Sequence, residues 1–390
     1  MKTASLLVFL ALFQALTTSA AAEDLVKWSG LAVLGATYSS ERRADFTSGI
    51  DHPNGAGGTR PTDWWSESRV MLQADAQLSP NVSAMLQGTA EHRYDNSFRP
   101  HVTAAALKWQ LTPNIYLRLA RQPFLNFLVT DDRVAWVRPT TEIYQTGLLN
   151  LYDGAELGWR TTTGDTTWHA QLYGGAIAYP VPGNTSNIDI QLNQLLGINL
   201  FATHGPHTLR VARIRGRLTM HSQDIDQAFA RLRMLPGGMA LSNHYQAVEA
   251  PTEHRSLAYC YQSERGYVLI EWSQFSTGES FVADSTQGHL TTGYHLGSIT
   301  PFFTLAGKQA NKVASDPNPI LNALFSNRAV GQKSIVVGAR WLIQPDTSVK
   351  MQLDYVINAN NSIGSLSNLQ PGFQPGQRYR LLSAALEHSF

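Results

Sequence analysis

Seven short polar breaks recur along this chain and alternate with longer polar segments. Each break contains Gly, Pro, Asn or Asp, the residues that tight turns need. The breaks lie at residues 79–81, 112–114, 162–165, 204–206, 263–266, 297–298 and 344–346. The longer segments lie near residues 39–64, 95–100, 122–153, 179–192, 221–253, 277–287, 309–332 and 358–377. With the chain end as a further break, eight long excursions require sixteen strands.

Apolar and polar residues alternate between the breaks, as in strands with two different faces. In residues 70–78 the apolar set is Val70, Leu72, Ala74, Ala76 and Leu78. A soluble β-sandwich could alternate too, but it would rarely place all its long loops at one end. An even strand count with tight turns at one end suits a closed barrel in a bilayer, because an open edge would leave backbone groups unpaired in hydrocarbon. We therefore predict an all-β fold, a 16-stranded antiparallel transmembrane β-barrel with both termini at the short-turn, periplasmic end.

The N-terminal segment is typical of a cleavable secretory signal. Residues 1–22 contain Lys2, an apolar run over residues 4–16 and a small-residue ending at residues 20–22. This predicts a mature chain over residues 23–390 that forms one barrel domain without a plug. No later stretch approaches the roughly 18 to 20 apolar residues of a transmembrane helix.

Composition narrows the classes of function. A net charge of +1 gives no nucleic-acid footprint. The single Cys260 excludes an intrachain disulfide, and no Cys/His cluster has metal-binding spacing. The pairs His221–Ser222 and Ser242–His244 lack the context of a nucleophile elbow. We therefore expect no bound nucleic acid, no metal, no cofactor and no enzymatic activity.

Taken together, these features resemble those of Gram-negative outer-membrane porins. The signal segment, the sixteen-strand rhythm, the long third loop after residues 117–121 and the ending at residues 386–390 carry the resemblance over the whole mature chain. It implies a multi-pass barrel among the lipid and lipopolysaccharide of the outer membrane, assembled as a homotrimer. It also implies that the barrel-assembly machinery recognises Phe390 and that the third loop folds into the lumen.

The third loop, residues 122–153, is the expected constriction. It is rich in aromatic residues, which can pack a loop against the wall while carboxylates face water. Asp131, Asp132 and Glu142 are its candidate acidic residues. An external flap with solvated charges is the alternative, but a loop of this length inside a compact domain is usually functional or disordered, and its aromatics argue against disorder.

Basic residues are expected on the barrel wall opposite. Arg213, Arg215 and Arg217 share one face of a predicted strand. Three guanidiniums facing lipid would each cost roughly 2 to 4 kcal/mol at the bilayer midplane, so we predict that they face the lumen. Further basic residues with lumenal parity are Arg69, Arg93 and Arg118.

An excess of arginine predicts a weak preference for anions, which Asp75, Glu91, Glu156, Glu271 and Asp354 would partly offset. The predicted function is passive diffusion of ions and small hydrophilic solutes. A substrate-selective porin for an anionic solute or an oligosaccharide is the alternative, because guanidinium groups match phosphate and carboxylate oxygens. A closed structural barrel would lack charged constriction residues.

Two further patterns predict local structure. In the fifth loop, residues 224–235 have the apolar spacing of a short amphipathic helix, which suits a packed external loop better than a lid or a subunit clamp. Tryptophans in or beside the strands are expected to form an interfacial girdle. They are Trp64, Trp65, Trp109, Trp159, Trp168, Trp272 and Trp341.

Overall fold

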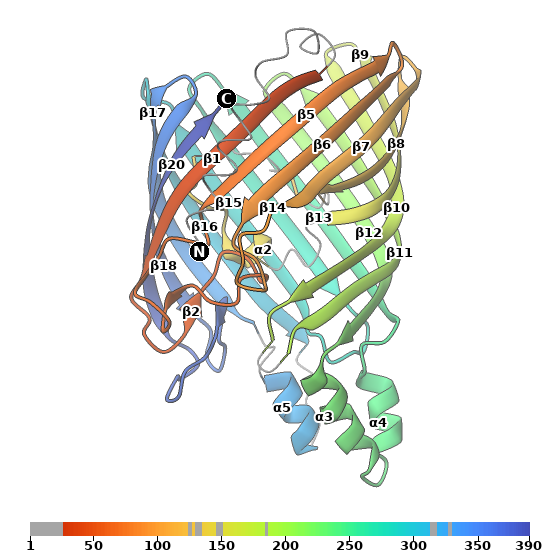
Figure 1. Cartoon of the computed structure of the whole chain (residues 1–390), viewed down its shortest axis with the longest axis vertical. Helices are drawn as coiled ribbons and strands as arrows, with labels where there is room; N and C mark the ends of the chain where they lie inside the picture. The colour runs from red at the N-terminus through yellow and green to blue at the C-terminus, as the bar shows by residue number, and fades with distance from the viewer. Residues whose placement is uncertain are drawn as a thin grey trace.

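The computed structural model describes residues 26–123, 127–128, 135–145, 151–183, 186–312, 318–326 and 330–390. Within them, sixteen long strands form a closed antiparallel barrel, which confirms the predicted fold class (Figure 1). These strands are β1 (Val26–Ser39), β5 (Arg69–Ser79), β6 (Val82–Glu91), β7 (His101–Thr112), β8 (Ile115–Pro123), β9 (Leu151–Thr163), β10 (Thr166–Val181), β11 (Ile188–His204), β12 (His207–His221), β13 (Ala250–Ser263), β14 (Gly266–Ser276), β15 (Asp284–Tyr294), β16 (Ile299–Lys312), β17 (Gln332–Gln344), β18 (Thr347–Asn358) and β20 (Arg378–Ser389).

The barrel closes between its first and last strands. β1 pairs with β5 through Val26↔Ala76 and with β20 through Leu31↔Ser389. The closure continues to the chain end, because Gly30 and Phe390 donate backbone hydrogen bonds to each other at 2.8 and 3.1 Å. No strand edge is therefore left unpaired at the seam, as a barrel in hydrocarbon requires.

All seven predicted breaks connect neighbouring strands at one end of the barrel. Three of these turns contain a glycine with φ near +60°, at Gly164 (56°), Gly205 (53°) and Gly297 (60°). Glycine suits this left-handed region because it has no Cβ to clash with the backbone. The turn-forming residues of the sequence therefore predicted the number of strands correctly.

The two faces of each strand have opposite chemistry over most of the barrel. On β18, Met351 and Leu353 are exposed outward, whereas Gln352 and Asp354 are buried on the inner side. The same contrast recurs on the second half of β20, where Leu382 and Leu386 are exposed outward and Ser383 and Glu387 are buried. The outer surface is thus an apolar band, which fits a surface that meets lipid.

Tryptophans mark the short-turn edge of this band. Trp109, Trp159, Trp168 and Trp341 are exposed near the short turns, and so is Trp28, which the sequence reading did not include. Trp272 lies further along β14, while Trp64 and Trp65 lie in the first loop. Four of the seven expected tryptophans therefore lie at the short-turn edge, where a girdle was predicted, and the other three lie elsewhere.

The long loops lie at the opposite end and contain the remaining elements. A three-stranded sheet joins the first and eighth loops, and the two-residue β4 extends the pairing of β1. Helices α3 and α4 of the fifth loop and α5 of the seventh project beyond the barrel (Figure 1). No described helix is long and apolar enough to cross a membrane. The elements are β2 (Asp45–Phe46), β3 (Ala56–Gly57), β4 (Thr62–Asp63), β19 (Leu366–Ser367), α2 (Thr141–Tyr144), α3 (Gln223–Arg233), α4 (Gly238–Tyr245) and α5 (Pro319–Ser326).

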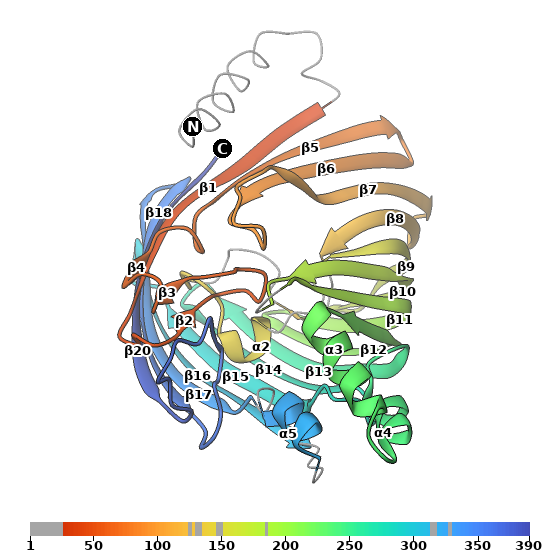
Figure 2. The same cartoon turned by 60° about the horizontal axis from the view of Figure 1, so that its bottom comes forward.

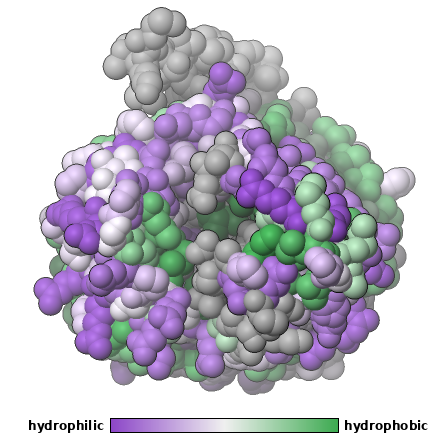
Figure 3. Space-filling view, turned by 90° about the horizontal axis from the view of Figure 1, so that it is seen from below, coloured by the Kyte–Doolittle hydropathy of each residue, from purple (hydrophilic) through white to green (hydrophobic). Residues whose placement is uncertain are grey.

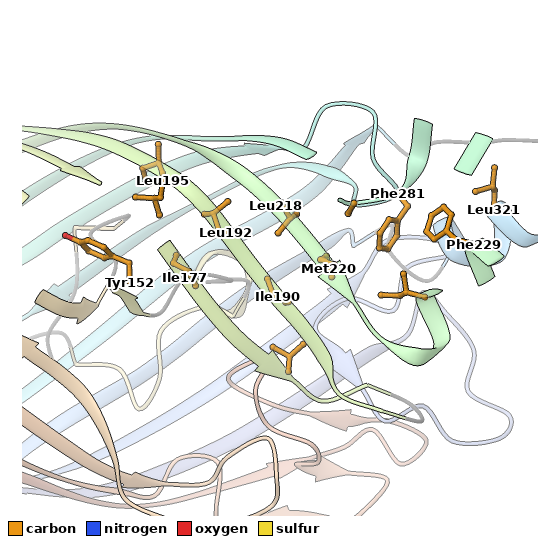
Figure 4. Close-up of a cluster of buried hydrophobic side chains, with 14 of the residues drawn as sticks. Tyr152, Ile177, Ile190, Leu192, Leu195, Leu218, Met220, Phe229, Phe281 and Leu321 are labelled. Atoms are coloured by element: carbon orange, nitrogen blue, oxygen red, sulfur yellow. The ribbon is translucent and has the colours of Figure 1, made fainter. Parts of the chain in front are cut away.

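An apolar cluster fills the inner side of the barrel at the long-loop end. It combines inward residues of β10, β11 and β12, such as Leu192 and Leu218, with Phe229 of α3, Phe281 of the sixth loop and Leu321 of α5 (Figure 4). The predicted fifth-loop helix is therefore present, starting at Gln223 rather than Asp224, and it packs as an external loop. The long-loop half of these strands therefore has an apolar inner face, whereas the half nearer the short turns carries buried polar residues such as Arg210 and Asn199.

Candidate solute pathway

The third loop enters the barrel. Figure 2 shows its helix α2 inside the ring of strands. Among its described residues, the backbone N–H of Val137 donates to Gln352 at 3.0 Å, and Trp136 Nε1 donates to Thr304 at 3.2 Å. Both acceptors lie on the inner face of the wall, on β18 and β16. The loop is thus fixed to one side of the lumen.

Arg138 joins the third loop to the wall through several buried polar contacts. It is 3% exposed, and its guanidinium donates to Asp354 at 2.6 Å and to Ser383 at 2.5 Å. Glu67 of the first loop lies 3.6 Å from the same group. Burial raises the pKa of Glu67, and the positive charge of Arg138 opposes that rise. A buried cation shared by two carboxylates ties the third loop to both the wall and the first loop.

A second anchor holds the loop near β14. The Glu271 carboxylate accepts hydrogen bonds from the backbone N–H of Leu128, at 2.5 Å, and from the hydroxyl of Tyr144. His289 lies 3.3 Å from the same carboxylate. Glu271 was expected to offset the lumenal arginines, but its oxygens bind the loop and it is 3% exposed.

Glu142 also belongs to the loop's attachment and does not line an open channel. It is 1% exposed, and Gln332 of β17 donates to it at 2.8 Å. Its proposed place at the constriction was therefore wrong, because α2 turns this side chain toward the wall. Asp131 and Asp132, the other acidic candidates, lie outside the described residues.

The described contacts of the third loop lie on one side of the lumen, and the inner wall differs in burial between the two sides. Inward residues of β14 to β18, such as His289, Thr304 and Gln352, are buried. Several inward residues of β5 to β8, such as Gln73 and Met85, are only half-buried, although Thr89 and Tyr116 are buried. Seen from the long-loop end, the molecule is hollowed near its centre, with hydrophobic residues at part of the edge (Figure 3). Among the described residues, β5 to β8 thus carry several of the more accessible inward side chains of the wall.

Two cations lie side by side on this part of the wall. Lys108 of β7 is directly opposite Arg118 of β8, which is in turn opposite Glu156 of β9. The Lys108 ammonium and the Arg118 guanidinium lie 4.7 and 5.3 Å from the ring centre of Tyr116. We call Lys108 and Arg118 the basic pair.

Glu156 compensates the pair only partly. It lies 3.7 Å from Arg118, but it is 1% exposed and accepts hydrogen bonds from Tyr116 at 2.5 Å and Gln122 at 2.8 Å. Its charge is thus turned into the wall, while Lys108 and Arg118 remain half-exposed to the lumen. The face of the basic pair that meets water is positive.

The predicted basic residues Arg69 and Arg93 lie nearer the long-loop end of the barrel than the basic pair does. Arg69 starts β5 on its inner face, directly opposite Glu91 of β6. Arg93 lies in the second loop just after β6, where its guanidinium stands 5.5 Å from the Tyr94 ring centre. Arg69 therefore lies at the long-loop end of this wall, and Arg93 lies beyond it in the second loop.

Arg213, Arg215 and Arg217 face outward, and their predicted lumenal placement was wrong. Arg210, Ala212 and Ile214 are buried on the inner face of β12, so the three odd-numbered arginines share the outer face with Leu209 and Val211. The prediction assigned the apolar side to lipid, but here the inner side is apolar because it packs in the cluster of Figure 4. The row does not line the channel.

Lys108 was missed by the sequence reading although its signal was present. It lies between Leu107 and Trp109, both exposed outward, so its strand parity alone places it inside. A single lysine forms no repeating pattern, whereas the three arginines alternate along one strand. Among the described residues, no group of three His, Cys, Asp or Glu side chains could hold a metal ion.

The fold is that of the outer-membrane porins, and the outward apolar band fits their location as integral barrels of the outer membrane. Similar solved structures include the outer membrane channel DcaP of Acinetobacter baumannii (9% identity, TM-score 0.59), with 94% of this chain and 97% of that chain covered. They also include OmpF of Salmonella typhi in complex with daunomycin (11% identity, TM-score 0.55), with 94% of this chain and 97% of that chain covered. The anion-selective porin of Comamonas acidovorans matches with 12% identity and a TM-score of 0.54, at 94% and 99% coverage.

Sequence comparisons add nothing to this likeness. No family model matches the chain, and no curated protein matches it. At these identities the likeness extends to the fold, and function has to be argued from the side chains.

Proposed function

We propose that this protein is an outer-membrane porin that forms a water-filled channel for passive diffusion of ions and small hydrophilic solutes, with a weak preference for anions. The observation that carries the proposal is the basic pair on the inner wall. Lys108 and Arg118 face the lumen at one level, while Glu156 is turned into the wall. Two fixed cations at a narrow level raise the local concentration of anions.

The third loop supplies the narrowing in this proposal. Arg138 and Glu271 hold it against one side of the lumen, so solutes pass between the loop and the basic pair. Because the loop is held by buried polar contacts, the width of the passage would be nearly constant. Asp131 and Asp132 remain candidates for the acidic side of this passage.

We further propose the assembly state and partners that the resemblance implies. The barrel would form a homotrimer in outer-membrane lipid and lipopolysaccharide, and one matching structure, OmpT of Vibrio cholerae, was solved in a trimer form. Phe390 would present the last strand to the barrel-assembly machinery. The mature chain would begin at Glu23 after removal of residues 1–22, and it would have no enzymatic activity.

A substrate-selective porin for an anionic solute is the second candidate. The basic pair flanks the Tyr116 ring, so a phosphate or carboxylate group could be held there beside an aromatic surface. Such a site would saturate, whereas a general diffusion channel would not.

Single-channel recording of the refolded protein in a planar bilayer tests both candidates. A salt gradient gives the ion preference, and conductance steps in groups of three would support a trimer. Clear cation preference would contradict the proposed selectivity, and absence of conductance would leave a closed structural barrel. A block that saturates with phosphate or a short-chain carboxylate would favour the second candidate.

A further inference from the structure

A group of charged residues interrupts the apolar outer surface on β12 and β13. On this surface Arg213 lies directly opposite Arg255, and Arg215 lies directly opposite Glu253. The side chains of Arg213, Arg215 and Arg255 are 46%, 61% and 55% exposed. We call these four residues the outer arginine cluster.

The cluster lies within the height of the apolar band. Arg213 and Arg215 are the seventh and ninth residues of β12 counted from the short turn. The seventh and ninth residues of β18, also counted from a short turn, are Leu353 and Tyr355. At about 3.3 Å per residue and a tilt of about 40°, the seventh residue is roughly 17 Å from the turn, inside an apolar band about 25 Å tall. Cations therefore stand on β12 where β18 presents apolar and aromatic side chains to lipid.

Neighbouring strands confirm this level. On β11, the residues opposite Arg213 and Arg215 are Ile198 and Leu196, both exposed and apolar. On β13, Leu257 lies two residues from Arg255 toward the short turn, and it is also exposed and apolar. The cluster is thus bordered by exposed apolar residues on the β11 side and on the side nearer the short turns.

One carboxylate organises the cluster without neutralising it. Glu253 accepts hydrogen bonds from Arg213 at 2.8 and 3.2 Å and from Arg255, and it lies 3.5 Å from Arg215. Three guanidiniums against one carboxylate leave a net charge of +2. Because Glu253 holds the Nε edges of the arginines, N–H groups of Arg215 and Arg255 remain exposed to a ligand.

We propose that the outer arginine cluster binds the phosphoryl group of an anionic lipid in the leaflet nearest the long loops. Exposed guanidiniums beside apolar side chains fit a ligand that has both a phosphate and acyl chains. Arg217, two residues further from the turn and outward-facing, extends the positive surface toward the lipid headgroups. The proposal requires only that the barrel lies in a bilayer, and it is independent of what passes through the lumen.

A second copy of the chain fits this surface less well. Docking against a positive cluster requires an acidic outer surface. Of the two exposed outward acids on the described strands, Asp153 and Asp189, Asp153 is already bound to Arg121 by two hydrogen bonds of 2.7 Å, and Asp189 lies at the long-loop end of β11. Two clusters placed face to face would repel each other. An anionic lipid supplies the missing negative charge.

Native mass spectrometry of the refolded protein in detergent tests the proposal. The protein is titrated with lipid A carrying its phosphates and, separately, with the dephosphorylated form. We expect the phosphorylated form to bind at least about tenfold more tightly. Equal binding of the two forms by the wild-type protein would overturn the proposal, whatever the variants do.

Two matched variants locate the site. Replacing Arg213, Arg215 and Arg255 by leucine should remove most of the preference for the phosphorylated lipid. Replacing three other outward cations by leucine should leave the preference nearly unchanged; these are Lys333, Arg378 and Arg380. A lysine version of the first variant keeps the charge and should bind with intermediate affinity, because it lacks the guanidinium fork.

The other occupants give different results. If inorganic phosphate displaced the lipid at equal concentration, the site would take a free anion and the lipid assignment would be wrong. If the leucine variant changed the oligomeric mass but not lipid binding, the surface would be a contact between copies. Either result would overturn the proposal.

Discussion

Lys108 and Arg118 lie directly opposite each other on β7 and β8, and both face the lumen. Like charges in register across two strands destabilise a sheet, by up to about 1 kcal/mol for a pair. In this structure the two cations lie 4.7 and 5.3 Å from the Tyr116 ring centre, and Arg118 also lies 3.7 Å from Glu156. A structural cost of this kind is expected where the charges serve the channel.

Replacing both members of the basic pair by glutamine should shift the ion preference toward cations. The expected change in the anion-to-cation permeability ratio is roughly two- to fivefold, because two fixed charges are removed from the inner wall. Reversal potentials in a salt gradient measure it.

A triple variant on the outer face of β12 is the matched control for the change in the basic pair. Replacing Arg213, Arg215 and Arg217 by alanine removes more positive charge but should leave the reversal potential unchanged, because these side chains lie outside the lumen. A larger shift in this control than in the pair variant would disprove the assigned faces.

Arg138→Ala should loosen the third loop and destabilise the barrel. The change leaves Asp354 and Glu67 buried without their shared cation, which typically costs about 3 to 5 kcal/mol. We expect a lower free energy of unfolding in guanidinium chloride and noisier single-channel currents.

Arg121→Ala provides the comparison for this change. Arg121 makes an equally short ion pair with Asp153, but the two side chains are 47% and 59% exposed. Exposed pairs contribute about 0 to 1 kcal/mol, so stability and current noise should barely change. Equal effects of the two substitutions would argue against the third loop as the element that Arg138 stabilises.

Acid should weaken the contact between the first and second loops. His92 is buried between His52, Trp65 and Phe98, and it lies 2.8 Å from the Asn96 side-chain oxygen. Burial lowers the pKa of His92 below its usual value of 6.5. Because the folded state favours the neutral ring, the stabilisation is complete above pH 6.5 and is lost as pH falls from there through the lowered pKa.

Hydrogen exchange of the two loops measures this effect. Intrinsic amide exchange slows as pH falls from 7 to 5, so the wild-type loops should show an excess of exchange over the rate that this slowing predicts. His92→Phe should abolish the excess, whereas the exposed His244→Phe on α4 should not. An excess that survives His92→Phe would assign the effect to another group.

Gly338→Ala should destabilise the wall between β16 and β18. An added Cβ would lie 2.3 Å from the Met351 carbonyl oxygen and 2.5 Å from the Phe302 ring. Overpacking of this kind costs about 1 to 3 kcal/mol. At Gly307 on neighbouring β16 the nearest atom is 3.9 Å away, so Gly307→Ala should change the free energy of unfolding by less than about 0.5 kcal/mol.

The sequence by itself determined the barrel. Turn residues at seven breaks and a period of two between them define strand number, order and direction, because both signals are local to each strand. Pro345 and Asp346, for example, end β17 whatever lies across the lumen. The fifth-loop helix was predictable for the same reason, since its apolar spacing is local.

The tertiary structure decided which face of a strand meets lipid and which charges meet water. Alternation alone cannot assign the inner face of β12, because packing against α3 and its neighbours makes that face apolar and leaves Arg213 outside. Nor can it show that Glu142 is turned toward the wall while Lys108 stays open, because both depend on where the third loop lies. Contacts between residues far apart in the chain, such as Arg138 with Asp354, fix that position.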